Sequence, residues 1–274
     1  MVNSKLSLQT LFFREVSILM SPASPNAERR PLNADRFVVR SYQPADRDAI
    51  RDLCCHTGFL GQPIDPVFED CALFADFLTD YYLTREPDSA FVVTIDGMVK
   101  GYLLGCRFPH RHQRFSVFHS VPLAAKALLR FPRYNAESRR FIQWIALNSW
   151  REVPDAPRNI GHFHINFLPE LKRVAVIRAV LEHYLRFLSD HGVKQISAQM
   201  VTFDDRRTLG LFERYGFKVL NRSRISKFER FTSEPVYLTT IIKDVVEKGD
   251  RVFYQVAPHS LERPGGSESP PQEN

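Results

Sequence analysis

The chain has 274 residues, 37 of them Lys or Arg and 31 of them Asp or Glu, which gives a formal net charge of +6. Its hydrophobic fraction of 44% is ordinary for a globular protein. The mild basic excess favours anionic ligands but does not by itself indicate nucleic acid. The four cysteines, Cys54, Cys55, Cys71 and Cys106, show neither metal-site spacing nor a secreted disulfide framework. We therefore expect reduced thiols and a cytoplasmic protein.

Residues 1–34 are predicted to form a flexible extension. Leu6–Leu19 contains apolar residues, but Gln9, Arg14 and Glu15 interrupt the run, so it is too short and too charged to span a bilayer. The segment also lacks the basic start and the small-residue cleavage pattern of a signal peptide. We expect no membrane span here.

The folded part is predicted to open with a strand over Phe37–Arg40. A helix then begins at Pro44, because proline favours the first helical turn, and ends near Gly58. Leu60–Pro66 is a predicted loop. Asp70–Leu83 is a predicted second helix, since its apolar residues recur on one side.

A hairpin is predicted next, from strands at Phe91–Ile95 and Val99–Cys106. The dipeptide Asp96-Gly97 between them is a strong hairpin signal. Gly101 and Gly105 interrupt the second strand, which indicates a bulge or a close backbone approach.

The segment from Arg107 to Ile160 is basic and aromatic, with predicted helices at Leu123–Leu129 and Ser138–Trp150. Such a surface can bind phosphate backbones and stack bases, contact acidic lipid, or cover a pocket as a lid. We favour the third alternative, a lid that covers an acceptor pocket. Nucleic acid is less favoured, because no recognised nucleic-acid-binding motif is present. The basic residues up to Arg140 are Arg107, Arg111, Arg114, Lys126, Arg130, Arg133, Arg139 and Arg140; Glu137 is the acid among them, and the aromatics are Phe108, Phe115, Phe118, Phe131 and Tyr134.

The central pattern lies between His162 and Leu188. His162–Leu168 alternates polar and apolar residues, which predicts a strand with one buried face, and Pro169 ends it. From Val174 the apolar residues recur at helical spacing. Lys172, Arg173 and Arg178, at the start of this helix, oppose its dipole, so we predict an anion site made of backbone amides and added cations. The alternative is an ordinary strand–helix unit with solvated basic residues.

Four histidines raise the question of metal: His110, His112, His162 and His164. Each pair is separated by one residue, so each pair could point one way. Neither Cys nor a carboxylate stands at ligand spacing, so we predict no metal site. His164 instead becomes a candidate general base, since its ordinary pKa lies near neutrality. The alternative is a hydrogen-bonded histidine of the sheet.

The C-terminal part is predicted as a strand at Gly192–Val201, a short helix at Asp204–Gly216, and strands at Lys218–Lys227 and Val236–Ile242. Residues 247–274 are rich in Pro, Gly, Ser and Glu near the end, which indicates a disordered tail.

This succession resembles the GCN5-related N-acetyltransferase (GNAT) superfamily. The resemblance rests on Val38–Ile50, His162–Leu188, Gly192–Val201 and Phe212–Phe217, and covers residues 35–246, with 107–160 as an insertion. It implies an α/β fold with a mixed, mostly antiparallel twisted sheet flanked by helices. It also implies acetyl-CoA as co-substrate and a small-molecule or protein amine as acceptor.

The family loop Gln/Arg-x-x-Gly-x-Gly/Ala aligns with Lys172, Ala175 and Ile177, so neither glycine is present. Phe212 stands where many members have a tyrosine that protonates the departing thiolate, and Asp205 where an asparagine often stands. By resemblance, Phe167 and Leu168 supply backbone donors that polarise the thioester carbonyl. The coenzyme-binding residues implied are Phe167, Leu168, Lys172, Arg173, Val174, Ala175, Val176, Ile177 and Arg178.

Two functions follow as hypotheses. The first is an acetyl-CoA-dependent N-acetyltransferase, with His164 or a water molecule as base and Asn166, Asp65 and Tyr82 as acceptor-site candidates. Asp65 and Tyr82 could equally be a solvated turn residue and a packed aromatic. The second is a weak or inactive descendant of the fold, which holds an anionic partner on its basic insertion.

Overall fold

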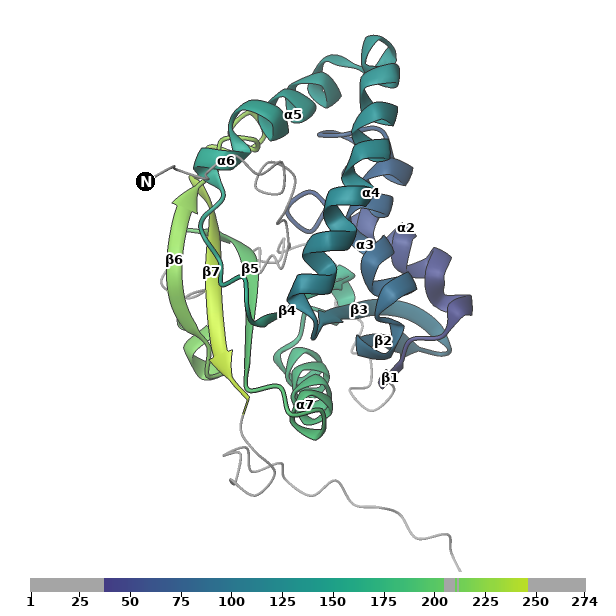
Figure 1. The fold of residues 1–274 in the computed structure, drawn as a ribbon, viewed down its shortest axis with the longest axis vertical. Coiled ribbons are helices and arrows are strands. Elements are labelled where there is room, and N and C mark those ends of the chain that lie inside the picture. The colour runs from purple at the N-terminus through teal and green to yellow at the C-terminus, as the bar shows by residue number, and fades with distance from the viewer. Residues whose placement is uncertain (1–36, 205–209, 211, 246–274) are drawn as a thin grey trace, which may run out of the picture.

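The computed structural model describes residues 37–204, 210 and 212–245 of the chain (Figure 1). The predicted N-terminal extension, the predicted tail and Asp205 therefore lie outside the described residues. Within the described part, no helix combines the length and the apolar character that crossing a lipid bilayer requires.

A single sheet of seven strands organises the described residues, in the order β1-β2-β3-β4-β5-β7-β6. Every neighbouring pair is antiparallel except β4 and β5, which run parallel. The expected mixed, mostly antiparallel sheet is thus confirmed. The strands are β1 (Phe37–Ser41), β2 (Ala90–Ile95), β3 (Met98–Cys106), β4 (Gly161–Phe167), β5 (Gln195–Phe203), β6 (Lys218–Arg224) and β7 (Val236–Asp244).

Helices cover both faces of the sheet (Figure 1). On β4, the side chains of Phe163 and Ile165 belong to the core cluster on the α7 side of the sheet. On the neighbouring strand β3, Tyr102 and Leu104 belong to the cluster on the α2–α3 side. This division follows from the alternation of side chains along a strand. The helices are α2 (Arg47–Thr57), α3 (Cys71–Arg85), α4 (Pro109–Arg130), α5 (Ala136–Leu147), α6 (Ser149–Glu152) and α7 (Val174–Asp190), with short turns η1 (Pro44–Asp46), η2 (Pro87–Ser89), η3 (Phe131–Arg133) and η4 (Pro169–Leu171).

The two glycines of β3 are sites of close approach, as predicted. A Cβ atom at Gly101 would overlap the ring of Phe167, and one at Gly105 would overlap the ring of Tyr184. Both aromatic rings lie in the core cluster between α7 and the sheet, so these glycines let the side chains of that cluster reach the backbone of β3.

Helix α4 is longer than predicted. The sequence indicated a helix only at Leu123–Leu129, whereas α4 runs from Pro109 to Arg130 through Pro122. An internal proline removes the hydrogen bond to the carbonyl four residues earlier, here that of Phe118. Phe118 and Pro122 are both exposed, so water can replace the lost donor and the helix continues.

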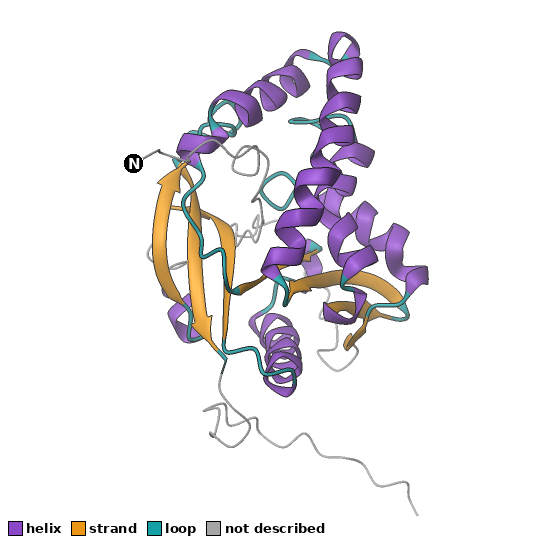
Figure 2. Cartoon of the chain, in the orientation of Figure 1, coloured by secondary structure: helices purple, strands orange, loops and turns teal. Residues whose placement is uncertain are grey.

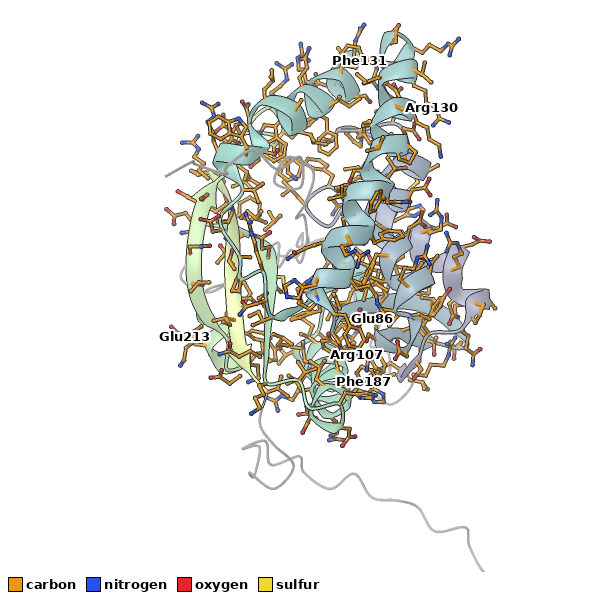
Figure 3. All side chains as sticks on the ribbon, viewed as in Figure 1. Glu86, Arg107, Arg130, Phe131, Phe187 and Glu213 are labelled. Carbon is orange, nitrogen blue, oxygen red and sulfur yellow. A yellow bond between two sulfur atoms is a disulfide. The ribbon has the colours of Figure 1, made fainter. Side chains whose placement is uncertain are left out.

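Helices α4 and α5 form an arm that extends away from the sheet (Figure 2). The predicted helix at Ser138–Trp150 is divided at Asn148 into α5 and α6. Figure 3 shows Arg107 beside Glu86 near the start of α4, and Arg130 and Phe131 near its far end. We refer to α4 and α5 together as the basic arm.

Two carboxylates, the buried Glu86 and the partly buried Glu152, anchor the arm at its two ends. Glu86 is 1% exposed and accepts hydrogen bonds from Tyr81 Oη (2.9 Å) and from the backbone amide of Arg107 (2.5 Å). At the other end, Glu152 accepts from the indole of Trp144 (2.7 Å) and from the backbone amide of Ser226 (2.6 Å). The arm is therefore tied to α3 and to the loop that follows β6.

The cysteines depart from the prediction. Cys55 and Cys71 form a disulfide that joins the end of α2 to the start of α3, whereas Cys54 and Cys106 are free and buried. The expectation of reduced thiols is wrong for the first pair, because folding brings two residues 16 apart in sequence into contact. The expected cytoplasmic location loses that support.

Candidate active site

Strands β4 and β5 separate soon after they begin. Their parallel register comprises Gly161 with Ile196 and His162 with Ser197, although β4 continues to Phe167 and β5 to Phe203. Beyond these pairs the two strands are not hydrogen-bonded to each other, and we call this unpaired stretch between β4 and β5 the opening of the sheet.

The edge of β4 presents backbone groups to this opening. The amide of Leu168 donates to the carbonyl of Lys100 (3.0 Å) and so faces β3. Consecutive residues of an antiparallel strand turn their peptide groups to opposite sides, so the amide of Phe167 faces the β5 side. Of the two expected backbone donors, Phe167 is directed at the opening and Leu168 is engaged within the sheet.

The start of α7 lies directly beyond this end of β4. The amides of Lys172 and Arg173 donate to the carbonyls of Pro169 (3.2 Å) and Leu171 (2.6 Å), and the first helical bond runs from Ile177 to Arg173 (3.1 Å). The N-cap residue, Arg173, makes no side-chain cap, and the first turn contains no acid. The backbone amides of residues 174–176, in the first turn of this 17-residue helix, are therefore the candidates for the predicted anion site. They lie at the positive end of the helix dipole and have no intrahelical acceptor.

The side chains of this turn divide between solvent and core. Ala175 and Arg173 are exposed, whereas Ile177 is 5% exposed and packs in the cluster beneath the sheet. The branched side chain of Ile177 therefore points away from the helix end and does not crowd it. Lys172 is partly buried, and this burial lowers the pKa of its ammonium group.

Tyr82 of α3 brings three histidines together. Its hydroxyl lies 2.9 Å from Nε2 of His162 and 3.5 Å from Nε2 of His112, and its ring meets that of His164 edge-on, with centroids 4.9 Å apart. The rings of His112 and His162 are 4.6 Å apart. We call Tyr82, His112, His162 and His164 the Tyr82 cluster; it lies on the α2–α3 side of β4.

The protonation of Tyr82 follows from its surroundings. The side chain is 2% exposed, and burial raises the pKa of its hydroxyl well above the ordinary value. Tyr82 therefore keeps its proton at neutral pH and can hydrogen-bond to a neutral imidazole. Each of the three histidines retains partial exposure, which leaves the cluster accessible to a ligand.

One histidine pair points as the sequence suggested and the other does not. His162 and His164 share a face because they lie on a strand. His110 and His112 lie on α4, where two residues are separated by roughly 200° of rotation; His110 is exposed while His112 joins the cluster. Among the described residues no group of three or more metal-binding side chains is arranged to hold an ion.

The other acceptor-site candidates are placed differently. Asn166 is 8% exposed, and its amide donates to the hydroxyl of Tyr102 (2.7 Å) on the same face of the sheet as His164. Asp65 is exposed in the loop that precedes α3. Tyr82 lies near the opposite end of this 15-residue helix. Since a helix rises by roughly 1.5 Å per residue, most of the helix length separates Tyr82 from the loop of Asp65. The fold therefore groups Asn166 with the Tyr82 cluster and leaves Asp65 apart.

The turn that precedes β6 contains a glycine with a positive φ angle. Gly216 has φ of 73°, and the amide of Phe217 donates to the carbonyl of Phe212 (2.9 Å), as in a Schellman motif. Phe212 is partly buried against the α7-side cluster. The hydroxyl of Tyr215 lies 3.4 Å from the carbonyl of Val174, so a phenol stands beside the first turn of α7.

Sequence reasoning considered His112 and His162 only as metal ligands and did not connect them with Tyr82. The alternation of His162 and His164 on a predicted strand was a usable signal, since it places both on one face. His112 had no such signal, because its position depends on the packing of α4 against α3.

No family model matches the chain. The solved structure of SsHAT is 24% identical, with a TM-score of 0.51, over 77% of this chain and 100% of that chain. An acetyltransferase of the GNAT family from Streptococcus pneumoniae is 12% identical over 77% of this chain and 99% of that one, with a TM-score of 0.44. YncA from Salmonella typhimurium, a putative acetyltransferase solved with its cofactor acetyl-CoA, is 12% identical over 78% and 97%, with a TM-score of 0.42.

The mixed, mostly antiparallel sheet and its flanking helices agree with the resemblance found in the sequence. The described part of this chain shares its fold with the solved structure of SsHAT.

Proposed function

We propose that this protein is an N-acetyltransferase that transfers the acetyl group of acetyl-CoA to an amine. One observation carries the proposal: the opening between β4 and β5 lies next to the α7 terminus, whose first turn has neither a side-chain cap nor an acid. Such a terminus binds anions through its amides and its dipole, and a thioester linked to a diphosphate requires both features close together.

The diphosphate of the coenzyme would be held by the amides of Val174, Ala175 and Val176. Lys172, Arg173 and Arg178 supply the cations expected from the sequence, which act as point charges or, for arginine, as paired donors. Two positions of the family loop lack glycine here. Ala175 adds one exposed methyl group at the helix end, whereas the side chain of Ile177 is buried. The residues present therefore fit a diphosphate.

The transfer forms a C–N bond to an uncharged amine and breaks the C–S bond of the thioester. The amide of Phe167, which faces the opening, is the donor for the thioester carbonyl. His164 accepts the amine proton, because imidazole is the side chain whose unperturbed pKa lies closest to neutrality. Tyr82 positions the imidazoles of the cluster, and Asn166 contacts the acceptor from the same face of β4.

The departing thiolate receives no proton from position 212, since phenylalanine has none to give. A coenzyme thiolate is a sufficiently stable anion to leave without one when the carbonyl is well polarised. The hydroxyl of Tyr215 lies beside Val174 and therefore contacts the diphosphate end of the coenzyme.

A second function is favoured by Phe212 and by the charge of the basic arm. A protein that retained the fold without the chemistry would hold an anionic partner on that arm. Calorimetric titration with acetyl-CoA separates the two. Micromolar binding, followed by acetylation of members of a panel of diamines, arylamines and peptides, supports the transferase. Absence of heat at millimolar acetyl-CoA would overturn it and leave the binding protein.

A further inference from the structure

The basic arm encloses a cavity that the proposed transfer does not use. It has a volume of about 290 Å³ and lies between α3, α4, α5 and α6. The part of its wall used below comprises Phe77, Leu123, Ala127, Leu128, Phe141 and Trp144. The Tyr82 cluster does not contribute to this wall.

The polar groups beside the cavity already have hydrogen-bond partners. Ser149, the polar residue of the wall, donates its hydroxyl to the carbonyl of Ile145 (2.5 Å). The indole of Trp144 donates to Glu152 (2.7 Å). An engineered apolar cavity of about 150 Å³ stays dry and binds apolar molecules such as benzene. A ligand here must therefore be hydrocarbon along its buried length.

The cavity reaches the surface at an apolar face of α4. Leu128 belongs to the wall and is also 68% exposed. Phe118, Val121 and Leu129, on the same side of the helix, are 75%, 66% and 77% exposed. Exposed apolar side chains grouped in this way mark an interaction surface.

The charges around this face select the kind of ligand. Arg111, Arg114 and Lys126 are exposed along α4, and the arm as a whole is strongly basic. A second copy of the chain would place like charges against like across a two-fold interface. An anionic group outside the cavity would instead meet complementary charge.

We propose that the cavity of the basic arm binds the hydrocarbon chain of an anionic amphiphile, whose head group lies outside among the arginines and lysines of α4. The chain can belong to a free fatty acid or to a lipid in a membrane. This site is separate from the acetyl-transfer site, so its test does not depend on acetyl-CoA.

The chain has two tryptophans, which allows a direct optical test. Trp144 lines the cavity, whereas Trp150 is 57% exposed and does not. In the full chain carrying Trp150→Phe, a fatty acid brominated at mid-chain should quench Trp144 saturably. In the matched Trp144→Phe protein, Trp150 should remain unquenched at the same concentrations. Absence of quenching of Trp144 up to millimolar probe, or equal quenching of both residues, overturns the proposal.

A pair of neighbouring alanines on α4 provides the second control. Ala127 lines the cavity and Ala125 is exposed outside it. In the Trp150→Phe background, Ala127→Phe should weaken the quenching affinity by roughly tenfold, since it fills the cavity, while Ala125→Phe should leave it within about twofold. Circular dichroism checks that both variants fold. A cavity variant that folds and binds the probe as tightly as its control excludes the cavity.

Vesicles then distinguish the two sources of the chain. Cosedimentation with phosphatidylcholine vesicles containing phosphatidylglycerol, reduced by Ala127→Phe and absent with phosphatidylcholine alone, identifies a membrane lipid. Quenching by the fatty acid without cosedimentation identifies a free fatty acid. Vesicle binding that Ala127→Phe does not change, together with no quenching, shows contact with the surface of the arm only and overturns the cavity site.

Discussion

The hydroxyl of Tyr82 lies 2.9 Å from Nε2 of His162. This contact joins α3 to the central strand beside the point where β4 and β5 separate. Tyr82 is buried, while the histidines around it are partly exposed. We therefore expect the Tyr82 hydroxyl to fix the orientation of the imidazole rings near the opening of the sheet.

Removing this hydroxyl should disturb transfer more than folding. We expect Tyr82→Phe to cost about 1 kcal/mol of unfolding free energy and to lower kcat by roughly 10- to 100-fold through misplaced imidazoles, with acetyl-CoA binding unchanged. Urea denaturation, steady-state kinetics and calorimetry measure the three quantities. Tyr134→Phe is the control, since its hydroxyl donates to Asp70 at the start of α3 (2.6 Å). Equal kinetic losses in both variants would contradict the role of Tyr82 in positioning the imidazoles.

His164 should be required for proton removal. His164→Gln keeps a polar side chain but has no basic nitrogen, so kcat should fall by about 10²- to 10⁴-fold. The fall of kcat on the acid side of the pH profile, where protonation inactivates an imidazole base, should also vanish. The exposed His110 provides the control as His110→Gln. If the His164 variant keeps both the rate and the pH profile of the parent, the base is another group.

The burial of Ile177 determines the expected effect of replacing it with the glycine of the family loop. Because the side chain is buried in the α7-side core, Ile177→Gly should destabilise the fold by about 2–5 kcal/mol and should not improve the affinity for acetyl-CoA. Ala175→Gly, at the exposed helix end, should leave that affinity the same or tighten it. Calorimetry on both variants, with urea denaturation, checks this; tighter binding in the Ile177 variant would show that its side chain does obstruct the coenzyme.

Acid should weaken the link between β1 and η1. Asp46 forms an ion pair with Arg40 (2.7 Å) and accepts the amide of Gln43 (2.8 Å). The hydrogen bond from Arg40 is the main cause of the lowered pKa of Asp46. A carboxyl with a depressed folded-state pKa contributes stability above its unfolded value, about 3.9, and loses it as pH falls through the folded value.

The measurement is the free energy of unfolding at successive pH values. Asp46→Asn should reduce stability at neutral pH and should flatten the decline below about pH 4. The control is Asp48→Asn. Asp48 lies in the first turn of α2, two residues after Asp46. An unchanged acid limb in Asp46→Asn would show that other carboxylates dominate it.

Much of the fold was readable from local pattern. Alternation marked β4, and helical spacing marked α7 from its first residue, Val174. Asp96-Gly97 marked the hairpin, and the two glycines of β3 marked close approaches. These features are local because strand and helix periods are set by the backbone over a few residues.

Tertiary packing decided the rest. Only the fold shows that Ile177 is buried, that Cys55 meets Cys71, that α4 continues through Pro122 and brings His112 to Tyr82, and that the arm encloses a cavity. The physical reason is that each depends on contacts between segments far apart in sequence. Which segments meet is determined by burial summed over the whole core, and no local period records it.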